Sequence, residues 1–173
     1  MVSESEVGTR FIHPQHGVVE VAETRIRMVG GIDVVYAVLL TQADRLTIEL
    51  PVGRFETVGI RPAMDEAEVV TLFEVLGNGG TEELRNWSRR FKDNEQRILS
   101  GDPLLVAEVV RSLTRRERER YLSHGEKRLL SRARHAVEAE IQLALNLTAD
   151  EAARKLDDVL DQMLDSDGRT ADT

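Results

Sequence analysis

The spacing of apolar residues changes at Arg61-Pro62, and this change constrains the fold of the chain more than any other feature. After the proline, apolar side chains recur every three or four residues, which is the period of an amphipathic helix. Before it, short runs rich in β-branched residues predict strands. These runs cover residues 18–23, 26–29, 32–40 and 46–50. The sequence therefore predicts an α+β protein, with a β module first and an all-α helical bundle after it.

Turn residues fix the expected shape of the β module. Gly30-Gly31 separates two of the runs, and a pair of glycines between strand-like segments is typical of a tight hairpin. Pro51 ends the last run. Because several short strands follow one another closely, we expect a small, strongly bent antiparallel barrel.

Capping residues mark the expected helices. The first is predicted over residues 65–76 and the second from Thr81 to about Leu99. Asp102 is placed to cap a third, with Pro103 at its first position. Capping boxes predict two further helices, starting at Ser123 and at Thr148. The predicted organisation is a β domain over residues 1–60, a helical domain over 61–166 and a flexible tail over 167–173.

Composition limits the compartment and the class of partner. The 173 residues include no cysteine, which fits a reducing cytoplasm and excludes disulfides and thiolate sites. Neither a signal peptide nor a membrane span is evident, so we expect a cytoplasmic monomer. The net charge of −8 argues against bulk nucleic-acid binding. Residues 82–134, however, carry 14 basic and 9 acidic side chains, so the positive charge is concentrated there.

The sequence offers little for catalysis or for a cofactor. His13 and His16 flank a predicted turn, where backbone hydrogen bonding explains them better than metal binding does. The zinc, P-loop, dinucleotide and nucleophile-elbow motifs are all absent from the sequence. We therefore expect no catalytic residue, no metal and no cofactor.

Trp87, the single tryptophan, lies among cations in Asn86-Trp87-Ser88-Arg89-Arg90-Phe91-Lys92. On a helical wheel it borders a predicted apolar stripe of Leu84, Phe91, Ile98 and Leu99 on one side and a strip of Asn94, Arg90 and Arg97 on the other. Two interpretations stay open: a partly buried core side chain, which periodicity alone favours, or a wedge for a nucleic-acid groove.

A second basic group also has two interpretations. Interleaved glutamates suggest a solvated helix surface, whereas phosphate positioning is the alternative. The group comprises Arg111, Arg115, Arg116, Arg118, Arg120, Lys127, Arg128, Arg132 and Arg134.

Five short motifs, in order over about residues 8–164, together resemble the CarD/CdnL family of bacterial transcription regulators. They are Pro14-Gln15-His16-Gly17, Glu23-Thr24-Arg25, Leu46-Thr47-Ile48-Glu49-Leu50-Pro51, Asn86-Trp87-Ser88-Arg89-Arg90 and Leu122-Ser123-His124-Gly125-Glu126-Lys127.

The resemblance implies a Tudor-like N-terminal domain that binds the β lobe of RNA polymerase. It also implies a helical domain that contacts promoter DNA at the upstream edge of the transcription bubble. There a tryptophan wedge would stabilise the open complex. On this basis the DNA-binding candidates are Trp87, Asn86, Arg89, Arg90 and Lys92, and the polymerase-binding candidates are Arg25, Arg27, Glu49 and Pro51.

The sequence departs from the family pattern at two positions. Glu49 stands where the family carries a basic residue, which reverses the local charge of the expected polymerase surface. His13 stands where an aromatic residue usually precedes the proline. An adaptor that binds a protein partner without DNA is the competing function, and an enzyme ranks third.

Overall fold

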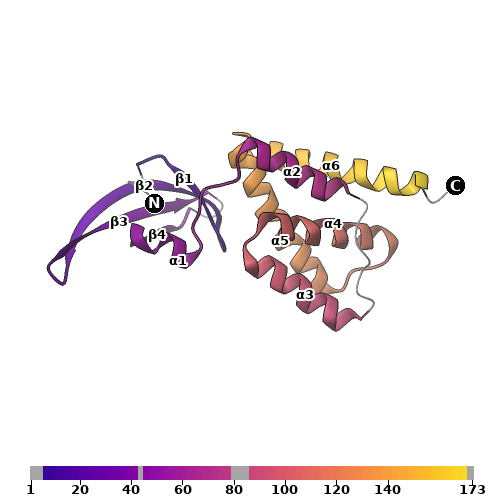
Figure 1. The fold of residues 1–173 in the computed structure, drawn as a ribbon, viewed down its shortest axis with the longest axis horizontal. Coiled ribbons are helices and arrows are strands. Elements are labelled where there is room, and N and C mark those ends of the chain that lie inside the picture. Colours follow the sequence, from indigo (N-terminus) through magenta and orange to yellow (C-terminus); the bar gives the residue numbers. More distant parts are fainter. Residues whose placement is uncertain (1–5, 43–44, 79–85, 171–173) are drawn as a thin grey trace. The chain divides into compact units, whose positions relative to one another are not determined.

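A computed structural model describes residues 6–42, 45–78 and 86–170 of the chain. The chain forms two compact units, Met1–Ala63 and Met64–Thr173, which are described separately below. The first holds the strands and the second holds a bundle of helices (Figure 1). An antiparallel β unit followed by an α-helical unit confirms the predicted α+β class.

The β unit is a four-stranded antiparallel meander in which each strand pairs with the next. Gly30 and Gly31 form a two-residue turn with φ of 60° and 83°, as expected of a tight hairpin. A short 3-10 helix, η1 (Val52–Arg54), and a single helical turn, α1 (Phe55–Val58), follow the sheet. The strands are β1 (Arg10–His13), β2 (Gly17–Val29), β3 (Ile32–Thr41) and β4 (Thr47–Pro51).

The core of the β unit covers only part of the β2–β3 hairpin. Phe11 and Phe55 meet edge to face with ring centroids 5.4 Å apart, and Val19, Val21 and Leu39 are fully buried beside them. The pairing of β2 with β3 shifts by one residue between Val21 and Glu23, which is a β-bulge. Every β2 residue beyond the bulge is exposed. The paired strands continue past the core as a hairpin arm, residues 22–36, which is two-stranded beyond the β4 pairing at Tyr36 (Figure 1).

The helical unit contains helices that share one apolar core. Its largest fully buried side chains include Leu72, Leu76, Leu113, Leu122 and Ile141. The helices are α2 (Glu66–Gly77), α3 (Trp87–Ser100), α4 (Pro103–Glu119), α5 (His124–Ala144) and α6 (Ala149–Thr170).

Local capping signals were reliable guides to the ends of most helices. Asp102 accepts from the N–H of Leu104, with Pro103 at the first helical position. Capping boxes form at Asp65, at Ser123 and at Thr148, where each side chain exchanges hydrogen bonds with the glutamate three residues later. At the C-terminal end, α6 continues to Thr170, beyond the predicted start of a tail at residue 167.

The start of α3 differs from the prediction. The helix begins at Trp87 and is capped by Asn86, whose backbone is extended. The predicted first residue, Thr81, lies outside the described residues. An asparagine side chain competes with the helical backbone for hydrogen bonds, so Asn86 favours a cap over a helix interior.

Candidate functional site

Trp87 occupies the first turn of α3 with one ring face packed and the rest open. Its ring stacks on Phe91, with centroids 5.4 Å apart and planes inclined by 29°. The side chain is nevertheless 49% exposed. The Oδ1 of Asn86 accepts from the backbone N–H of Arg89 at 3.1 Å, which holds the helix end beneath the indole. The tryptophan is therefore neither a buried core residue nor a free side chain. Its expected contact with Leu84 falls outside the described residues.

Phe91 in turn rests on the first turn of α5. A Cβ built at Gly125 would lie 2.9 Å from Phe91 Cε2, closer than real side chains approach. The absence of a side chain at this position lets the Cε2 edge of the phenylalanine ring lie close to α5. A stack of Trp87, Phe91 and Gly125 thus connects the start of α3 to the start of α5.

Arg90 holds the same two helices together from the buried side of α3. Its Nη2 donates to Glu126 Oε1 at 2.8 Å and its Nε donates to the same oxygen at 3.3 Å. Both residues are almost inaccessible, at 5% and 2% exposure. The sequence-based proposal that Arg90 contacts phosphate has to be revised, because its guanidinium faces the interior of the bundle.

Glu126 remains ionised in this interior for a specific reason. Burial raises the pKa of its carboxyl group, but hydrogen bonds from Arg90 and from Ser123 outweigh that effect, and the pKa is lowered overall. Glu126 Oε2 accepts from the backbone N–H of Ser123 at 3.0 Å and from its hydroxyl at 2.8 Å. The carboxylate therefore completes the capping box of α5 and neutralises the buried arginine.

The buried face of α3 is rotated from the predicted one. Arg90, Asn94 and Ile98 are the buried residues, whereas Leu99 is 65% exposed. The sequence prediction had assigned the buried face to the most apolar residues of the helix. The observed face is instead set by Glu126, a charged partner on another helix.

Among the described residues, the exposed cations closest in sequence to the indole are Arg89 and Lys92. Both are exposed, and neither forms an ion pair within the part of the chain that the structure describes. They remain available to an anionic partner.

Some arginines of the second basic group form contacts within the fold, and others are exposed to solvent. Arg111 is buried and donates to the carbonyl of Val75 at 2.7 Å, and Arg134 pairs with Asp157 at 2.5 Å. Arg128 and Arg132 are exposed. They follow Gly125 by three and seven residues and so share the side of α5 on which Phe91 rests. The solvated-surface interpretation therefore holds for the exposed members, others are used within the fold, and phosphate positioning stays a prediction.

In the β unit, the four polymerase-binding candidates share one face of the sheet. The register aligns Arg25 with Tyr36 and Tyr36 with Pro51, while Glu49 lies opposite Val38 on the same side. Arg27 pairs with Glu49 at 2.6 Å, and its guanidinium carbon lies 5.1 Å from the centre of the Tyr36 ring.

Each charged candidate on this face already has a neighbour of opposite sign. Arg25 donates two hydrogen bonds to Glu23, at 2.8 and 2.7 Å, and this contact lowers the pKa of the Glu23 carboxyl group. The negative charge that Glu49 places where the family carries a basic residue is therefore neutralised by its ion pair with Arg27. Sequence reasoning did not single out Glu23 or Tyr36 as site residues. Two features of the sequence could have identified them. Glu23 precedes Arg25 by two residues, so both side chains lie on the same face of β2, and counting back from the Gly30-Gly31 turn places Tyr36 opposite Arg25.

His13 is a structural histidine of the β1–β2 turn. It is buried, and its Nδ1 accepts from the backbone N–H groups of Gln15 and His16 at 3.1 and 3.3 Å, as predicted. Burial, with a smaller effect of His16, lowers its pKa. Across the described ranges, no three histidine or acidic side chains are grouped closely enough to hold a metal ion. None of the described helices has the length and apolar character required to cross a membrane.

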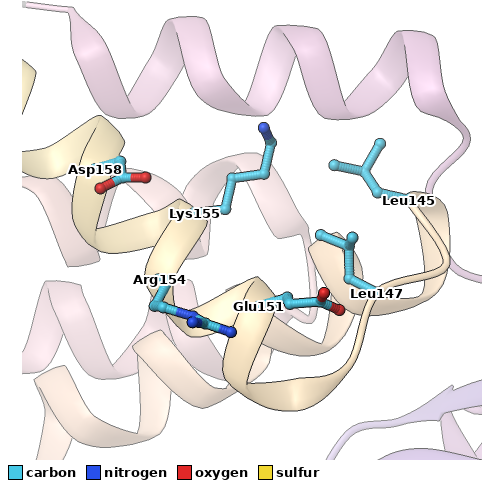
Figure 2. A pocket seen from close by; sticks show the side chains of 6 residues that line it. All are labelled: Leu145, Leu147, Glu151, Arg154, Lys155 and Asp158. Atoms are coloured by element: carbon cyan, nitrogen blue, oxygen red, sulfur yellow. The ribbon is translucent and has the colours of Figure 1, made fainter.

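A shallow cavity of about 400 Å³ lies at the turn between α5 and α6 (Figure 2). Its two leucines form an apolar floor, and its charged side chains carry both signs. Glu151 accepts from the backbone N–H of Thr148 and so is occupied by a helix cap. The lining residues are Leu145, Leu147, Glu151, Arg154, Lys155 and Asp158.

Comparison with known proteins places this arrangement in a family. Residues 71–157, which contain Trp87, Phe91, Gly125 and Glu126, match the family model described as the CarD C-terminal domain. The chain is also 26% identical over 145 residues to a Bacillus subtilis (strain 168) protein, YdeB, whose name describes it as a candidate transcription factor. That alignment covers 83% of this chain and 94% of YdeB.

Proposed function

Since the chain belongs to the CarD family, a family of transcription regulators, we propose that it stabilises the promoter open complex with Trp87. The indole enters the DNA minor groove at the upstream edge of the transcription bubble, while the β unit binds the β lobe of RNA polymerase. The observation that carries this proposal is the half-exposed indole, supported from below by Phe91 and Gly125.

A supported aromatic ring suits a wedge better than a free one does. An apolar wedge between base steps has to work against stacking, which amounts to a few kcal/mol per step. DNA at the edge of a bubble is already partly unstacked, so less work is required there. The contact with Phe91 reduces the conformational freedom that Trp87 loses on binding.

The surroundings of Trp87 favour phosphate. The N-terminal end of α3 carries partial positive charge, and the exposed side chains of Asn86, Arg89 and Lys92 lie within its first two turns. Arg90 contributes indirectly, because its pair with Glu126 fixes α3 against α5. These contacts position the ring without reading base edges, so the expected preference is for DNA shape and melting.

Docking on polymerase compensates for weak DNA affinity. The net charge of −8 opposes binding to free DNA. Attachment through the face of Arg25, Arg27, Glu49 and Pro51 raises the local concentration of the DNA-binding unit to about the millimolar range. A small basic surface is then sufficient.

The lifetime of open complexes after addition of a competitor tests the DNA-side proposal. We expect Trp87→Ala to shorten this lifetime about tenfold, equivalent to roughly 1.4 kcal/mol of lost contact. Leu99→Ala is the matched control, because it removes another exposed apolar side chain from the same helix. Equal lifetimes for wild type and Trp87→Ala would overturn the wedge. If that variant still binds polymerase, the adaptor function would replace it.

Capture of the isolated polymerase β lobe by the chain tests the proposed binding of the β unit to polymerase. We expect Arg25→Glu to reduce binding, because it places like charge beside Glu23 and removes a cation from the proposed contact face. Arg54→Glu is the control, since it makes the same charge change at an exposed position of η1. Equal binding by both variants would remove Arg25 from the interface.

A further inference from the structure

Tyr121 is the most exposed large apolar side chain in the described part of the chain, at 80%. It lies between α4 and α5, directly before the last of the five motifs that carry the family resemblance, so the resemblance assigns it no role. Single exposed apolar residues are common on protein surfaces. The surroundings of this ring therefore decide whether it has a partner.

The backbone on both sides of Tyr121 is fixed by contacts within the helical unit. The N–H of Arg120 donates to the C=O of Arg116 at 2.7 Å, at the end of α4. On the other side, Leu122 is fully buried and Ser123 caps α5. Because its neighbours are anchored, the ring is presented by an ordered segment, and little backbone freedom is lost when a partner binds it.

A cation lies over the ring of Tyr121. The Nζ of Lys127, in the first turn of α5, is 4.4 Å from the ring centre. This cation–π contact restricts the orientation of the ring and occupies one of its faces. Since the side chain is 80% exposed, the rest of the ring is open to solvent. A flat ring with one open face suits a flat partner that stacks on it.

The segment around the ring is positively charged, although the whole chain carries −8. Residues 115–128 include six basic and three acidic side chains. Arg120, next to the ring in sequence, is exposed and forms no ion pair within residues 86–170. The exposed Glu117 and Glu119 weaken the positive field but leave it net positive. Cations beside an exposed aromatic ring match the phosphates and bases of single-stranded nucleic acid.

Tyr121 and Trp87 are held on opposite flanks of the first turn of α5. Phe91, beneath Trp87, lies against Gly125, whereas Tyr121 lies against Lys127. Two positions along a helix correspond to a rotation of about 200°, and a helix with its side chains is about 10–12 Å wide. The two rings are therefore separated by at least the width of one helix, which corresponds to a few nucleotides along a strand at about 3.4 Å each.

We propose that Tyr121 stacks on an unpaired base of the melted promoter, a few nucleotides from the position of Trp87, while Arg120 contacts a neighbouring phosphate. Lys127 is a positioning residue, because it orients the ring. This inference rests on the proposed contact of Trp87 with the edge of the bubble. Every base has a flat face, so the second ring strengthens the hold on melted DNA without adding sequence preference.

Binding of labelled oligothymidylate to the full chain at low salt tests the stacking contact without polymerase. We expect Tyr121→Ala to weaken strand binding about tenfold and to change binding of a duplex of the same length less than twofold. Tyr121→Phe keeps the ring and should bind the strand as wild type does. Unchanged Trp87 emission from the free variants verifies that the helical unit is folded. Equal strand affinities for wild type and Tyr121→Ala, or no strand binding, would overturn the stacking contact while the proposed function stands.

The salt dependence of the same binding tests the phosphate contact. We expect Arg120→Gln to reduce the slope of log affinity against log salt by about 0.7, the value for one phosphate of a single strand. Arg154→Gln is the matched control, because it makes the same charge change at an exposed position of α6. Equal slopes for the two variants would contradict the contact of Arg120 with phosphate.

Permanganate oxidation of thymines, which attacks unstacked bases, tests the contact in open complexes. The templates place a thymine in turn at each unpaired position near the upstream edge of the bubble. We expect Tyr121→Ala to raise the reactivity of one thymine at least threefold and Tyr121→Phe to leave it unchanged. An unchanged pattern in Tyr121→Ala, with a lifetime still shortened by Trp87→Ala, would overturn the second ring alone. Loss of both effects would overturn the proposed function as well.

Discussion

Trp87 and Arg90 lie three residues apart on α3, yet one is half-exposed and the other is buried in an ion pair with Glu126. The two roles depend on each other. The buried pair fixes the rotation of α3, and that rotation presents the indole at the surface with Phe91 beneath it. Removing either charge would take a buried ion-pair partner from the other, which is far less favourable than the intact pair.

At this scale we predict that Glu126→Gln destabilises the helical unit by about 3 kcal/mol at pH 7, because the buried Arg90 guanidinium loses its ion pair with the carboxylate. The pKa of Glu126 is lowered in the folded state, so its contribution is complete above its ordinary value of 4.5 and is lost as the pH falls through the folded-state pKa. Denaturant unfolding of both proteins from pH 7 to strongly acidic pH measures this. A stability difference that does not shrink on acidification would contradict the assigned ion pair.

At the scale of elements, α3 and α5 meet where Phe91 packs on Gly125. We predict that Gly125→Ala changes the unfolding free energy by less than about 1 kcal/mol, because the gain in helix propensity offsets the strain. It nevertheless displaces Phe91, so the emission of Trp87 shifts and open-complex lifetime falls. Truncating the ring in a Gly125→Ala, Phe91→Leu double variant relieves the clash. Its Trp87 emission should match that of Phe91→Leu alone; a further shift would argue against the packing described.

The boundaries of helices and strands show which features of the fold can be predicted from the sequence. Caps such as Asp102 and Ser123 act on backbone groups two or three residues away, so sequence identified them. The Gly30-Gly31 hairpin is local for the same reason. The face of α3 could not be predicted, because Arg90 finds its partner 36 residues further along the chain. β1 and α1 were missed because four residues are too few to establish a period.

For the candidate site as well, local features could be predicted from the sequence, whereas contacts between distant residues could not. Arg89 and Lys92 were predicted as surface residues, and the structure places both there. Periodicity alone favoured a partly buried Trp87 and the family resemblance an exposed wedge; the side chain is 49% exposed. Arg90 was placed on the same surface by the helical wheel and by the family resemblance, and it is instead buried. The pairing of Glu49 with Arg27 depends on the register of two strands against β3, which composition does not encode.

At the scale of the whole molecule, the two units are joined by a very short connection. Arg61 is bound to the β unit through two backbone hydrogen bonds with Ile12, at 2.8 and 3.1 Å. Met64 is bound to the helical unit, where its N–H donates to the buried Glu140 carboxylate at 3.0 Å. Only Pro62 and Ala63 lie between these anchors, so the two units are linked by two residues.

We predict that inserting twelve glycine and serine residues between Pro62 and Ala63 lowers the effective concentration of Trp87 at the bubble roughly tenfold. Open-complex lifetime should fall accordingly, while β-lobe binding is unchanged because the β unit keeps its own contacts. An insertion that leaves the lifetime unaltered would show that the length of this connection does not matter.

The most direct measurement places a photo-crosslinking phenylalanine analogue at position 87 in open complexes formed by the full chain with polymerase. We predict crosslinks to promoter bases at the upstream edge of the bubble. We also predict that Arg25→Glu weakens them, since the helical unit is then held less often at the DNA. Crosslinks only to protein, or DNA crosslinks that persist when lobe binding is lost, would contradict the claim that a polymerase-tethered Trp87 meets the melted promoter.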